Sequence, residues 1–573
     1  MLRFSPIAKP QRQFLAVAKR QRLQRSSSIL AGASSRLYSL GASKPHPKSA
    51  GWVKSLTVAA FASATTGFLM YSNAKSGPEI SCAQPQYASL EEMKQAIKEI
   101  QHELGEDSIS TDDEDLRIHG YSEWSSINIE RLPVAVVFPK STEQVATIAR
   151  ICHRYHVPMI PYSGGSSVEG NVSTPFGGIS VDFLNMGNIV AFHPEEFVQF
   201  IQSYWKSNRS ADLCSMDVVV QPSVSWMELN ETIKDSGLFF PVDPGPPAKI
   251  GGMIATNCSG TNAVRYGTMK DWVINLTVVL ADGKIIKTRQ RPRKSSAGYN
   301  LNGLFTGSEG TLGFVTEATL KLARLPEETG VAVTTFPTMR DAANAATQVI
   351  RQGIPVGAVE ILDDVQMDVI NKMGATGREW KKLPTLFFKF SGTKAGVQDN
   401  IDGVREIVSQ NKGGNFEVEK DKVKQQILWA ARKEALWSML CMRESGHEVW
   451  STDVAVPISR LPDLVGSTEI SKKDLEQLGL FGSMLGHVGD GNFHETILFD
   501  GAKERDKVGN CVHEMVYRAI EMEGTCTGEH GIGLGKKDFL EKEVGEGSIS
   551  VMRAIKLSLD PLWLMNPGKV FDF

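Results

Sequence analysis

Cysteine is scarce in this sequence and is never arranged as a binding motif. The seven cysteines lie singly along the chain, at Cys82, Cys152, Cys214, Cys258, Cys441, Cys511 and Cys526. No pair has the Cys-x-x-Cys spacing, so neither a disulfide framework nor a zinc finger is indicated. The absence of Cys-x-x-Cys-His also excludes a covalently attached c-type haem. This cysteine usage is typical of a protein from a reducing compartment.

The chain also lacks an excess of positive charge and any internal repeat. Its formal net charge is −3 over 573 residues, whereas a nucleic-acid-binding protein needs a basic excess to neutralise phosphates. The sequence therefore predicts no nucleic-acid partner. With 41% hydrophobic and 22% charged residues, the composition is that of a globular protein. The length predicts two or more domains.

The first part of the chain lacks acidic residues altogether. From Met1 to Gly77 there is no Asp or Glu, whereas Arg, Lys and Ser recur. This composition predicts a mitochondrial presequence (a transit peptide) over 1–50, with a disordered basic tail as the alternative. The following stretch, uncharged between two lysines, is just long enough to cross a bilayer. We therefore expect a transmembrane anchor in the mitochondrial inner membrane over 51–78, with a longer presequence or a soluble segment as alternatives.

After this N-terminal region the chain has the periodicity of a folded protein. Residues 89–104 have the spacing of an amphipathic helix, and 133–165 indicate a strand, a helix and a strand. Further strands are expected at 177–183, 217–223, 275–286 and 310–322. These segments predict a first domain over 79–325. A second domain is expected over 326–545, and 546–573 is expected to return to the first.

Two glycine-rich loops follow predicted strands. The first, PYSGGSSVEGN at 161–171, combines three glycines with several serine hydroxyls. The second, at 242–273, has a Pro-Gly turn and a pair of adjacent glycines. Glycine lets the backbone approach a ligand closely, and consecutive N–H groups can bind a pyrophosphate. Either loop alone is more often a simple turn, but the two together fit a dinucleotide in an extended form.

Two histidines and a glutamate form a candidate metal site towards the C-terminus. His487 and His494 flank a Gly-Asp-Gly-Asn turn, so one loop can direct both imidazoles to one point. Glu529 adds an anionic oxygen, which gives three protein ligands and open positions, as in catalytic zinc sites. Iron or manganese would also accept imidazole and carboxylate. For each histidine alone, a packed or surface position is the ordinary alternative.

These motifs occur together in a known family. In order along the chain they are the two glycine loops, GSEGTLGFVTEATLKL, GHVGDGNFH, GEHGIG and MNPGK. With them, residues 130–573 resemble the flavoproteins built on the vanillyl-alcohol-oxidase fold and, within that family, the mitochondrial cytochrome-linked D-lactate dehydrogenases. The resemblance implies an α+β fold. It has a two-subdomain FAD-binding domain over 79–325 and an α+β substrate (cap) domain over 326–545.

The resemblance also implies which residues bind FAD. The first loop is expected to contact the pyrophosphate, and the other positions are expected to line the rest of the cofactor. The residues so assigned are Ser163, Gly164, Gly165, Ser166, Ser167, Gly170, Asn171, Pro244, Gly251, Gly252, Ser259, Tyr266, Gly267, Asp271, Val315 and Asn566. Because the first loop contains no histidine, non-covalent FAD is expected.

For catalysis, the resemblance assigns His487, His494 and Glu529 as ligands of a divalent metal, with zinc favoured over iron or manganese. His530 is then expected to take the hydroxyl proton of the substrate as general base, and a purely structural role is its alternative. Arg432 is assigned to the substrate carboxylate, which a guanidinium fork can hold in a bidentate way. Without the family, Arg432 would be interpreted as a solvated helix arginine.

The implied reaction is FAD-dependent oxidation of D-lactate to pyruvate, with cytochrome c as the electron acceptor. In relatives that oxidise D-2-hydroxyglutarate, a Lys and a Thr stand at the places of Ser451 and Leu436. Losing these partners for a second carboxylate favours a small monocarboxylate as substrate. The alternatives are another D-2-hydroxyacid dehydrogenase, an oxidase, and a catalytically silent flavin-binding membrane protein. The intact histidines and glutamate disfavour the silent protein.

One segment departs from the pattern of the family. Residues 197–215, which include Phe, Tyr and Trp, stand between two strands that are almost adjacent in relatives. Our interpretation is a retained intron, and a genuine insertion is the alternative. A genuine insertion is expected to form a surface loop near the FAD-binding domain. Sequencing of the transcript distinguishes the two.

Overall fold

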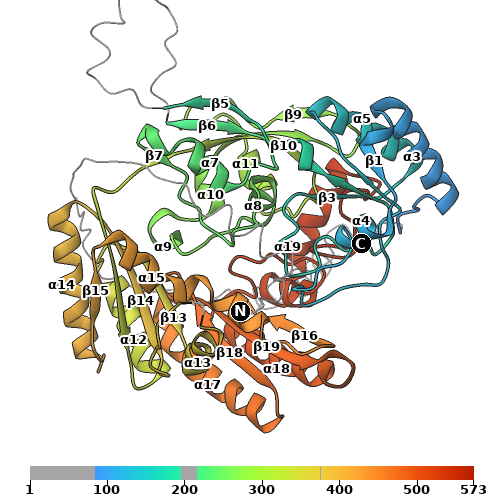
Figure 1. The fold of residues 1–573 in the computed structure, drawn as a ribbon. Coiled ribbons are helices and arrows are strands. Elements are labelled where there is room, and N and C mark those ends of the chain that lie inside the picture. The colour runs from blue at the N-terminus through green and yellow to red at the C-terminus, as the bar shows by residue number, and fades with distance from the viewer. Residues whose placement is uncertain (1–83, 195–215, 375) are drawn as a thin grey trace, which may run out of the picture. The chain divides into compact units, whose positions relative to one another are not determined.

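The structure of this chain is a computed structural model, and it describes residues 84–194, 216–374 and 376–573. Three sequence predictions fall outside these ranges: the presequence at 1–50, the anchor at 51–78 and the insertion at 197–215. Within the described ranges, no helix has both the length and the apolar character needed to span a bilayer. Pro85–Phe573 belongs to a single compact unit (Figure 1).

The first sheet forms where the sequence predicts a strand, a helix and a strand. Its order is β1-β2-β4-β3, and β2, β4 and β3 run parallel. The bounds are β1 Ile109–Ser110, β2 Ala135–Val137, β3 Met159–Tyr162 and β4 Ile179–Asp182. Helices α3 (Leu90–Leu104) and α5 (Thr142–Tyr155) share one apolar core with these strands. Ser89 and Ser141 accept N–H groups of the first turns as N-caps, so both predicted helices are confirmed.

The second sheet is antiparallel throughout, in the order β5-β6-β10-β8-β9. The bounds are β5 Ile189–His193, β6 Asp217–Val220, β8 Val273–Val279, β9 Ile285–Lys287 and β10 Phe314–Lys321. β8 and β9 form the hairpin predicted from Asp282-Gly283, where Gly283 has φ +82°. Shorter elements complete this region: α4 Asp113–Ile118, α7 Trp226–Thr232, β7 Leu238–Phe239, α8 Ile250–Thr256, α9 Ala263–Tyr266, α10 Met269–Trp272, α11 Leu301–Phe305 and β11 Ala323–Arg324.

The third sheet has eight strands in the order β15-β12-β14-β13-β18-β19-β16, with β17 paired to β19. The bounds are β12 Glu328–Thr335, β13 Val356–Leu362, β14 Thr385–Gly392, β15 Glu417–Glu419, β16 His447–Ser451, β17 Val454–Ala455, β18 Phe481–Gly486 and β19 Asn492–Asp500. The helices around it are α12 Met339–Arg351, α13 Asp364–Met373, α14 Lys394–Gln410, α15 Lys422–Lys433, α16 Ala435–Leu440, α17 Leu461–Gln477 and α18 Gly501–Glu521.

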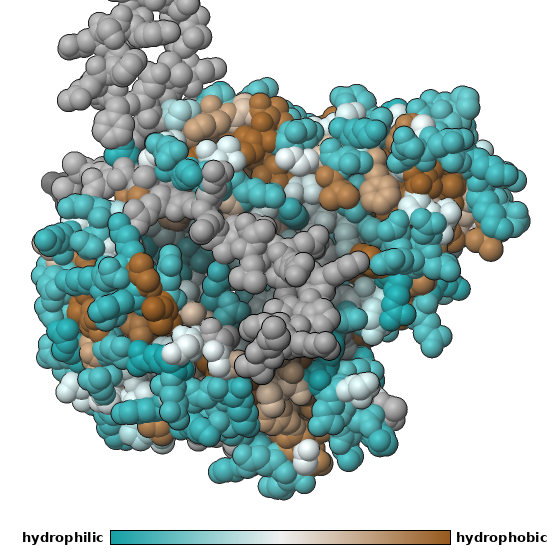
Figure 2. Space-filling view, viewed as in Figure 1, coloured by the Kyte–Doolittle hydropathy of each residue, from teal (hydrophilic) through white to brown (hydrophobic). Residues whose placement is uncertain are grey.

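The two faces of the third sheet carry different helices, because side chains alternate along each strand. One face shares a core with α12, α14, α17 and α18, through Phe388, Phe390 and their neighbours. The opposite face packs Phe387 against Leu428 of α15. Hydrophilic residues cover most of the described surface in Figure 2, and the hydrophobic ones form separate small patches. The apolar side chains are thus largely enclosed between the layers.

The C-terminal segment lies against β3 of the first sheet. It follows α19 (Lys537–Leu559), which is kinked at Gly545. Met565 pairs with Met159, and the Asn566 N–H donates to the Met159 carbonyl at 2.8 Å. Near the end of α19, Lys556 Nζ donates to Asp560 Oδ2 at 2.5 Å and to the Met565 carbonyl at 2.8 Å. Both charged side chains are at most 2% exposed, so each depends on the other for its charge to be tolerated.

We expect Asp560→Ala to lower the free energy of unfolding by about 3–5 kcal/mol, because it leaves the Lys556 ammonium buried without its counter-ion. The matched control is Asp572→Ala, which removes an ion pair to Lys537 of the same helix, with Asp572 63% exposed. That change should cost less than about 1 kcal/mol. Urea unfolding of the FAD-loaded protein, followed by tryptophan fluorescence, measures both. Equal effects of the two substitutions would contradict the role of the buried pair.

Candidate active site

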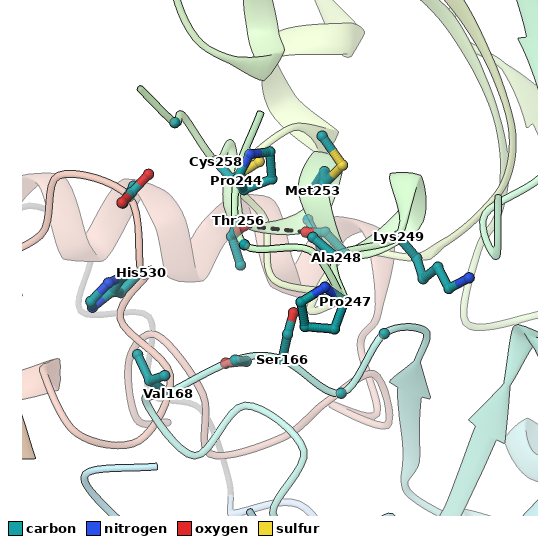
Figure 3. Close-up of a pocket in the computed structure, with 18 of the residues that line it drawn as sticks. Ser166, Val168, Pro244, Pro247, Ala248, Lys249, Met253, Thr256, Cys258 and His530 are labelled. Atoms are coloured by element: carbon teal, nitrogen blue, oxygen red, sulfur yellow. Dashed lines mark hydrogen bonds between the residues drawn. The ribbon is translucent and has the colours of Figure 1, made fainter. Parts of the chain in front are cut away.

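A cavity of about 590 Å³ is lined by both glycine loops and by residues of the third-sheet region. Most of the predicted site residues meet there. They are Ser163, Gly164, Gly165, Ser166, Ser167, Asn171, Pro244, Gly251, Gly252, Val315, Arg432, His487, His494, Glu529, His530 and Asn566. In the close-up of Figure 3, Ser166 of the first loop lies near Pro247 of the second, and Val168, further along the first loop, lies on the side of His530. The cavity volume is in the range of cofactor and substrate sites.

The two glycine loops approach each other closely on one side of this cavity. A Cβ at Gly164 would lie 2.7 Å from the Pro247 carbonyl oxygen and 3.2 Å from the Lys249 nitrogen. Only glycine therefore permits this approach. At Gly252, by contrast, an added Cβ would meet no atom within 4 Å. The backbone of α8 is thus open to the cavity at this point, which fits a cofactor that lies against main chain rather than against side chains.

Five predicted cofactor residues do not line the cavity: Gly170, Ser259, Tyr266, Gly267 and Asp271. Tyr266 packs in an aromatic cluster. The Asp271 carboxylate accepts the N–H of Thr268 at 3.0 Å and closes a capping box there. Ser259 Oγ donates to Glu529 Oε2 at 2.5 Å. These residues shape the surroundings of the cavity, and their contact with FAD stays a prediction.

The turn between β18 and β19 brings the two histidines together as the sequence predicts, with ring centroids 5.4 Å apart. Gly491 has φ +76° in this turn, and a Cβ there would collide with the Val456 carbonyl. His487 Nε2 lies 3.0 Å from Glu529 Oε1, and His494 Nε2 lies 3.8 Å from the same oxygen. The three ligand atoms lie within 4.8 Å of one another. This is close enough for all three residues to hold one metal ion.

The other ring nitrogen of each histidine is already hydrogen-bonded. His487 Nδ1 lies 2.8 Å from Glu360 Oε1, and His494 Nδ1 lies 3.1 Å from the Thr452 carbonyl oxygen. An Nδ1–H that donates to an acceptor leaves the Nε2 lone pair for a metal, which is the usual arrangement around ligand histidines. Two imidazoles and a carboxylate fit zinc, and also iron or manganese. The residues present therefore fit the predicted ion.

The charges around the two histidines differ. Burial lowers the pKa of His494 to about 4, against the attraction of Asp453, so this ring is neutral, as a ligand must be. Burial alone would also lower the pKa of His487, but Glu360 and Glu529 raise it well above its ordinary value. A metal bound at His487 would take the place of the hydrogen bond between Nε2 and Glu529.

Asp453 fixes the loop that carries Glu529 and His530. It is fully buried, and its Oδ2 accepts the N–H of Glu529 at 2.9 Å, the N–H of His530 at 2.8 Å and the Thr527 hydroxyl at 2.8 Å. Asp453, His494 and His530 are also close enough to one another to hold a metal. These hydrogen bonds, however, occupy the Asp453 carboxylate, which favours His487, His494 and Glu529 as the ligand set.

His530 stacks on His494, with ring centroids 5.1 Å apart and an angle of 15°. Its Nδ1 is buried and makes no hydrogen bond to any residue that the structure describes. The carboxylate oxygens of Glu169 and Asp453 lie 3.9 and 4.0 Å from it. Unlike the two candidate ligands, His530 thus has an Nδ1 that is not committed to an acceptor, on a ring that lines the cavity.

Sequence reasoning missed Glu360 and Lys389. Lys389 lines the cavity, where its Nζ lies 4.1 Å from the centre of the Trp429 ring and donates to Thr261 Oγ1 at 3.1 Å. Glu360 lies behind His487 and Arg432, and its carboxylate oxygens lie 2.8 Å from a nitrogen of each. Each is the one charged residue of an otherwise uncharged strand, VGAVEIL and TLFFKFSG. Charged residues are seldom buried without a partner. A single charged residue in an uncharged strand was therefore the sequence signal that could have identified these two residues.

Comparison with known proteins decides the family. A model of the FAD binding domain matches residues 133–289, and a model of the C-terminal domain of FAD linked oxidases matches residues 325–570. A mitochondrial D-lactate dehydrogenase [cytochrome] from Arabidopsis thaliana is 44% identical over 484 residues, which are 84% of this chain and 81% of that protein. The protein of the same name from Kluyveromyces lactis is 44% identical over 502 residues, 85% and 83% of the two chains. The chain belongs to the FAD-linked oxidase family.

The fold of this FAD-linked oxidase agrees with solved structures. The 4-ethylphenol oxidase from Gulosibacter chungangensis superposes with a TM-score of 0.68, at 19% identity, over 86% of this chain and 99% of that one. The expected two-domain, FAD-binding fold of the vanillyl-alcohol-oxidase type, with mixed α and β content, is confirmed, and so is FAD as the cofactor. The chain is an FAD-dependent oxidoreductase.

We expect Asp453→Ala to loosen the loop at 524–536. The substitution leaves the buried N–H groups of Glu529 and His530 without their acceptor, and each such loss costs roughly 1–3 kcal/mol. Hydrogen exchange of peptides that span this loop should therefore accelerate in the FAD-loaded variant. Glu541→Ala, at an exposed position of the following helix, is the control and should leave exchange in the loop unchanged. Unchanged exchange in Asp453→Ala would show that other contacts hold the loop.

Proposed function

We propose that this FAD-linked oxidase is a mitochondrial D-lactate dehydrogenase that oxidises D-lactate to pyruvate and passes the electrons to cytochrome c. Two relatives at 44% identity carry that name. The observation that carries the proposal is the convergence of His487 Nε2, His494 Nε2 and Glu529 Oε1 in the cavity that both glycine loops and His530 also line. One cavity thus offers places for a flavin, a metal and a base.

The cofactor assignments follow the same geometry. We assign a divalent metal, zinc before iron or manganese, to His487, His494 and Glu529. We assign non-covalent FAD to the region 79–325, with the first glycine loop on the pyrophosphate and Asn566 contributed from the C-terminal segment. The openness of the backbone at Gly252 supports this placement.

In the mechanism, each side chain has one task. A bound flavin would supply the hydride acceptor for the substrate Cα, and a metal held by His487, His494 and Glu529 would make the substrate hydroxyl more acidic. His530 takes the hydroxyl proton, and the position of its ring on the cavity wall, beside His494 and Glu529, supports this role. Asp453 acts indirectly, because it holds the backbone of His530 in place. Arg432 orients the substrate through its carboxylate.

The cavity wall supports a monocarboxylate as the substrate. Leu436 and Ser451, at the two places where D-2-hydroxyglutarate enzymes carry Thr and Lys, both line the cavity. Trp124 and Trp437 form a further part of the wall, with ring centroids 5.6 Å apart. A second carboxylate against this wall would lose water without gaining a full set of partners.

The relatives' names support a mitochondrial location. The finer assignments rest on sequence alone and are part of the proposal. They are the presequence at 1–50, the inner-membrane anchor at 51–78, the domain limits 79–325 and 326–545, and the C-terminal segment at 546–573.

Anaerobic mixing of the purified, FAD-loaded protein with D-lactate should bleach the visible absorption band of the flavin. L-lactate and D-2-hydroxyglutarate, tested in parallel, should bleach it far more slowly, and pre-treatment with a chelator should slow the reaction with D-lactate. Fast bleaching by D-2-hydroxyglutarate would move the assignment to that substrate. A flavin that none of the three reduces would favour the catalytically silent alternative.

Replacement of His530 by Ala should leave FAD content unchanged and slow flavin reduction by D-lactate by roughly 10²–10⁴-fold, the usual contribution of a general base. The FAD stoichiometry from the absorption spectrum serves as the internal control for folding. Stopped-flow absorbance gives the rate of flavin reduction separately from later electron transfer. A normal rate in the variant would remove His530 from the mechanism.

A further inference from the structure

Glu360 is a buried acid that lies behind the wall of the cavity. It lies in β13 and is 1% exposed. The next residue of that strand, Ile361, pairs with Gly486 at the end of β18. This register sets Glu360 beside the point where the chain leaves β18 and enters the turn that begins with His487. The cavity itself is lined without Glu360.

Both oxygens of Glu360 contact residues that do line the cavity. Oε1 lies 2.8 Å from His487 Nδ1, and Oε2 accepts a hydrogen bond from Arg432 Nε at 2.8 Å. The three side chains are 1%, 8% and 11% exposed. A carboxylate has acceptor capacity on each oxygen, so Glu360 can accept from both partners at once.

Each partner keeps available the nitrogen atoms that its proposed role needs: Nε2 of His487 for a metal, and the terminal nitrogens of Arg432 for a carboxylate. With Nδ1 donated to Glu360, His487 directs Nε2 toward Glu529. With Nε donated to Glu360, the two terminal nitrogens of Arg432 make no hydrogen bond to any residue in the described part of the chain. A bridge that served only stability would tie scaffold residues together. This bridge ties a candidate metal ligand to the candidate anchor of the substrate carboxylate.

We propose that Glu360 is a positioning residue that holds His487 and Arg432 in one geometry and so couples metal binding to substrate binding. The inference rests on the proposed function, because it takes His487 as a metal ligand and Arg432 as the carboxylate anchor. A shift of either side chain would break its hydrogen bond to this buried carboxylate or pull the carboxylate away from the other partner.

The experiment compares the FAD-loaded wild-type protein with Glu360→Gln, in two separate measurements. After removal of metal with a chelator, Zn²⁺ alone is titrated back by competition with a chromophoric chelator. Steady-state kinetics with D-lactate then give KM and kcat. A glutamine has the shape of Glu360, but its NH2 group would face either His487 Nδ1–H or Arg432 Nε–H, so one of the two hydrogen bonds would be lost. Zn²⁺ binding should weaken by roughly 10–100-fold, and KM should rise while FAD stoichiometry stays unchanged.

Glu417→Gln is the matched control, because it makes the same chemical change at a glutamate of β15 whose two oxygens accept hydrogen bonds from Arg378 at 2.7 Å and which does not line the cavity. Its Zn²⁺ affinity and KM should equal those of the wild type. If Glu360→Gln does not retain FAD, Glu360→Asp decides. The aspartate keeps the negative charge but is one methylene too short to reach both partners. The loss of Zn²⁺ affinity and the rise in KM should therefore both occur, but be smaller than in Glu360→Gln.

Wild-type Zn²⁺ affinity together with wild-type KM in an FAD-loaded Glu360 variant would overturn the proposal. The Zn²⁺ titration needs no turnover, so it separates this proposal from the proposed function. If D-lactate fails to reduce the wild-type flavin while Glu360→Gln still loses Zn²⁺ affinity, the assignment of the substrate fails and the positioning of His487 by Glu360 stands.

Discussion

Three carboxylates, those of Glu360, Asp453 and Glu529, lie among the histidines of the active site, where little water reaches them. Burial alone would raise the pKa of each, yet each is held below its ordinary value by positive neighbours and hydrogen bonds. A buried charge that loses its partner costs several kcal/mol. His487 and Arg432 must therefore stay where the carboxylates are. The positions of the side chains that face the cavity are thus set by the buried carboxylates behind them.

The two sides of the cavity offer a ligand different kinds of contact. On the side of the glycine loops, contact depends on exposed main chain, and a side chain at Gly164 would already prevent the close approach of the two loops. On the opposite side, the contacts are charge-assisted hydrogen bonds such as that between Glu360 and Arg432. A cofactor that stays bound suits the first kind of surface. A substrate that must arrive, lose a proton and leave suits the second.

Sequence patterns predicted the local elements and the residues that share a motif. The capped helix after Ser141, the hairpin at Asp282-Gly283 and the pairing of His487 with His494 across one turn all depend on short-range chemistry. Glu360 was not predicted as a site residue because its partners, Arg432 and His487, are 72 and 127 positions away along the chain. The register of β13 against β18 brings His487 beside Glu360, and the packing of α15 on the sheet brings Arg432 to it. Tyr266 and Asp271 are the opposite case. The family motif assigned them to FAD, but in the folded chain Tyr266 packs among aromatic rings and Asp271 caps a helix. Their contact with the cofactor is still to be tested.

The hydrogen bond from Ser259 to Glu529 has a consequence for how such enzymes diversify. It joins a loop of the region that the FAD-binding model matches to a candidate metal ligand 270 positions later. A chimera that takes its N-terminal half from one relative and its C-terminal half from another would inherit both halves of this contact only if the parents agree at both positions. Exchange of the two halves between relatives is thus constrained by this hydrogen bond, as it is by the one from Lys389 to Thr261.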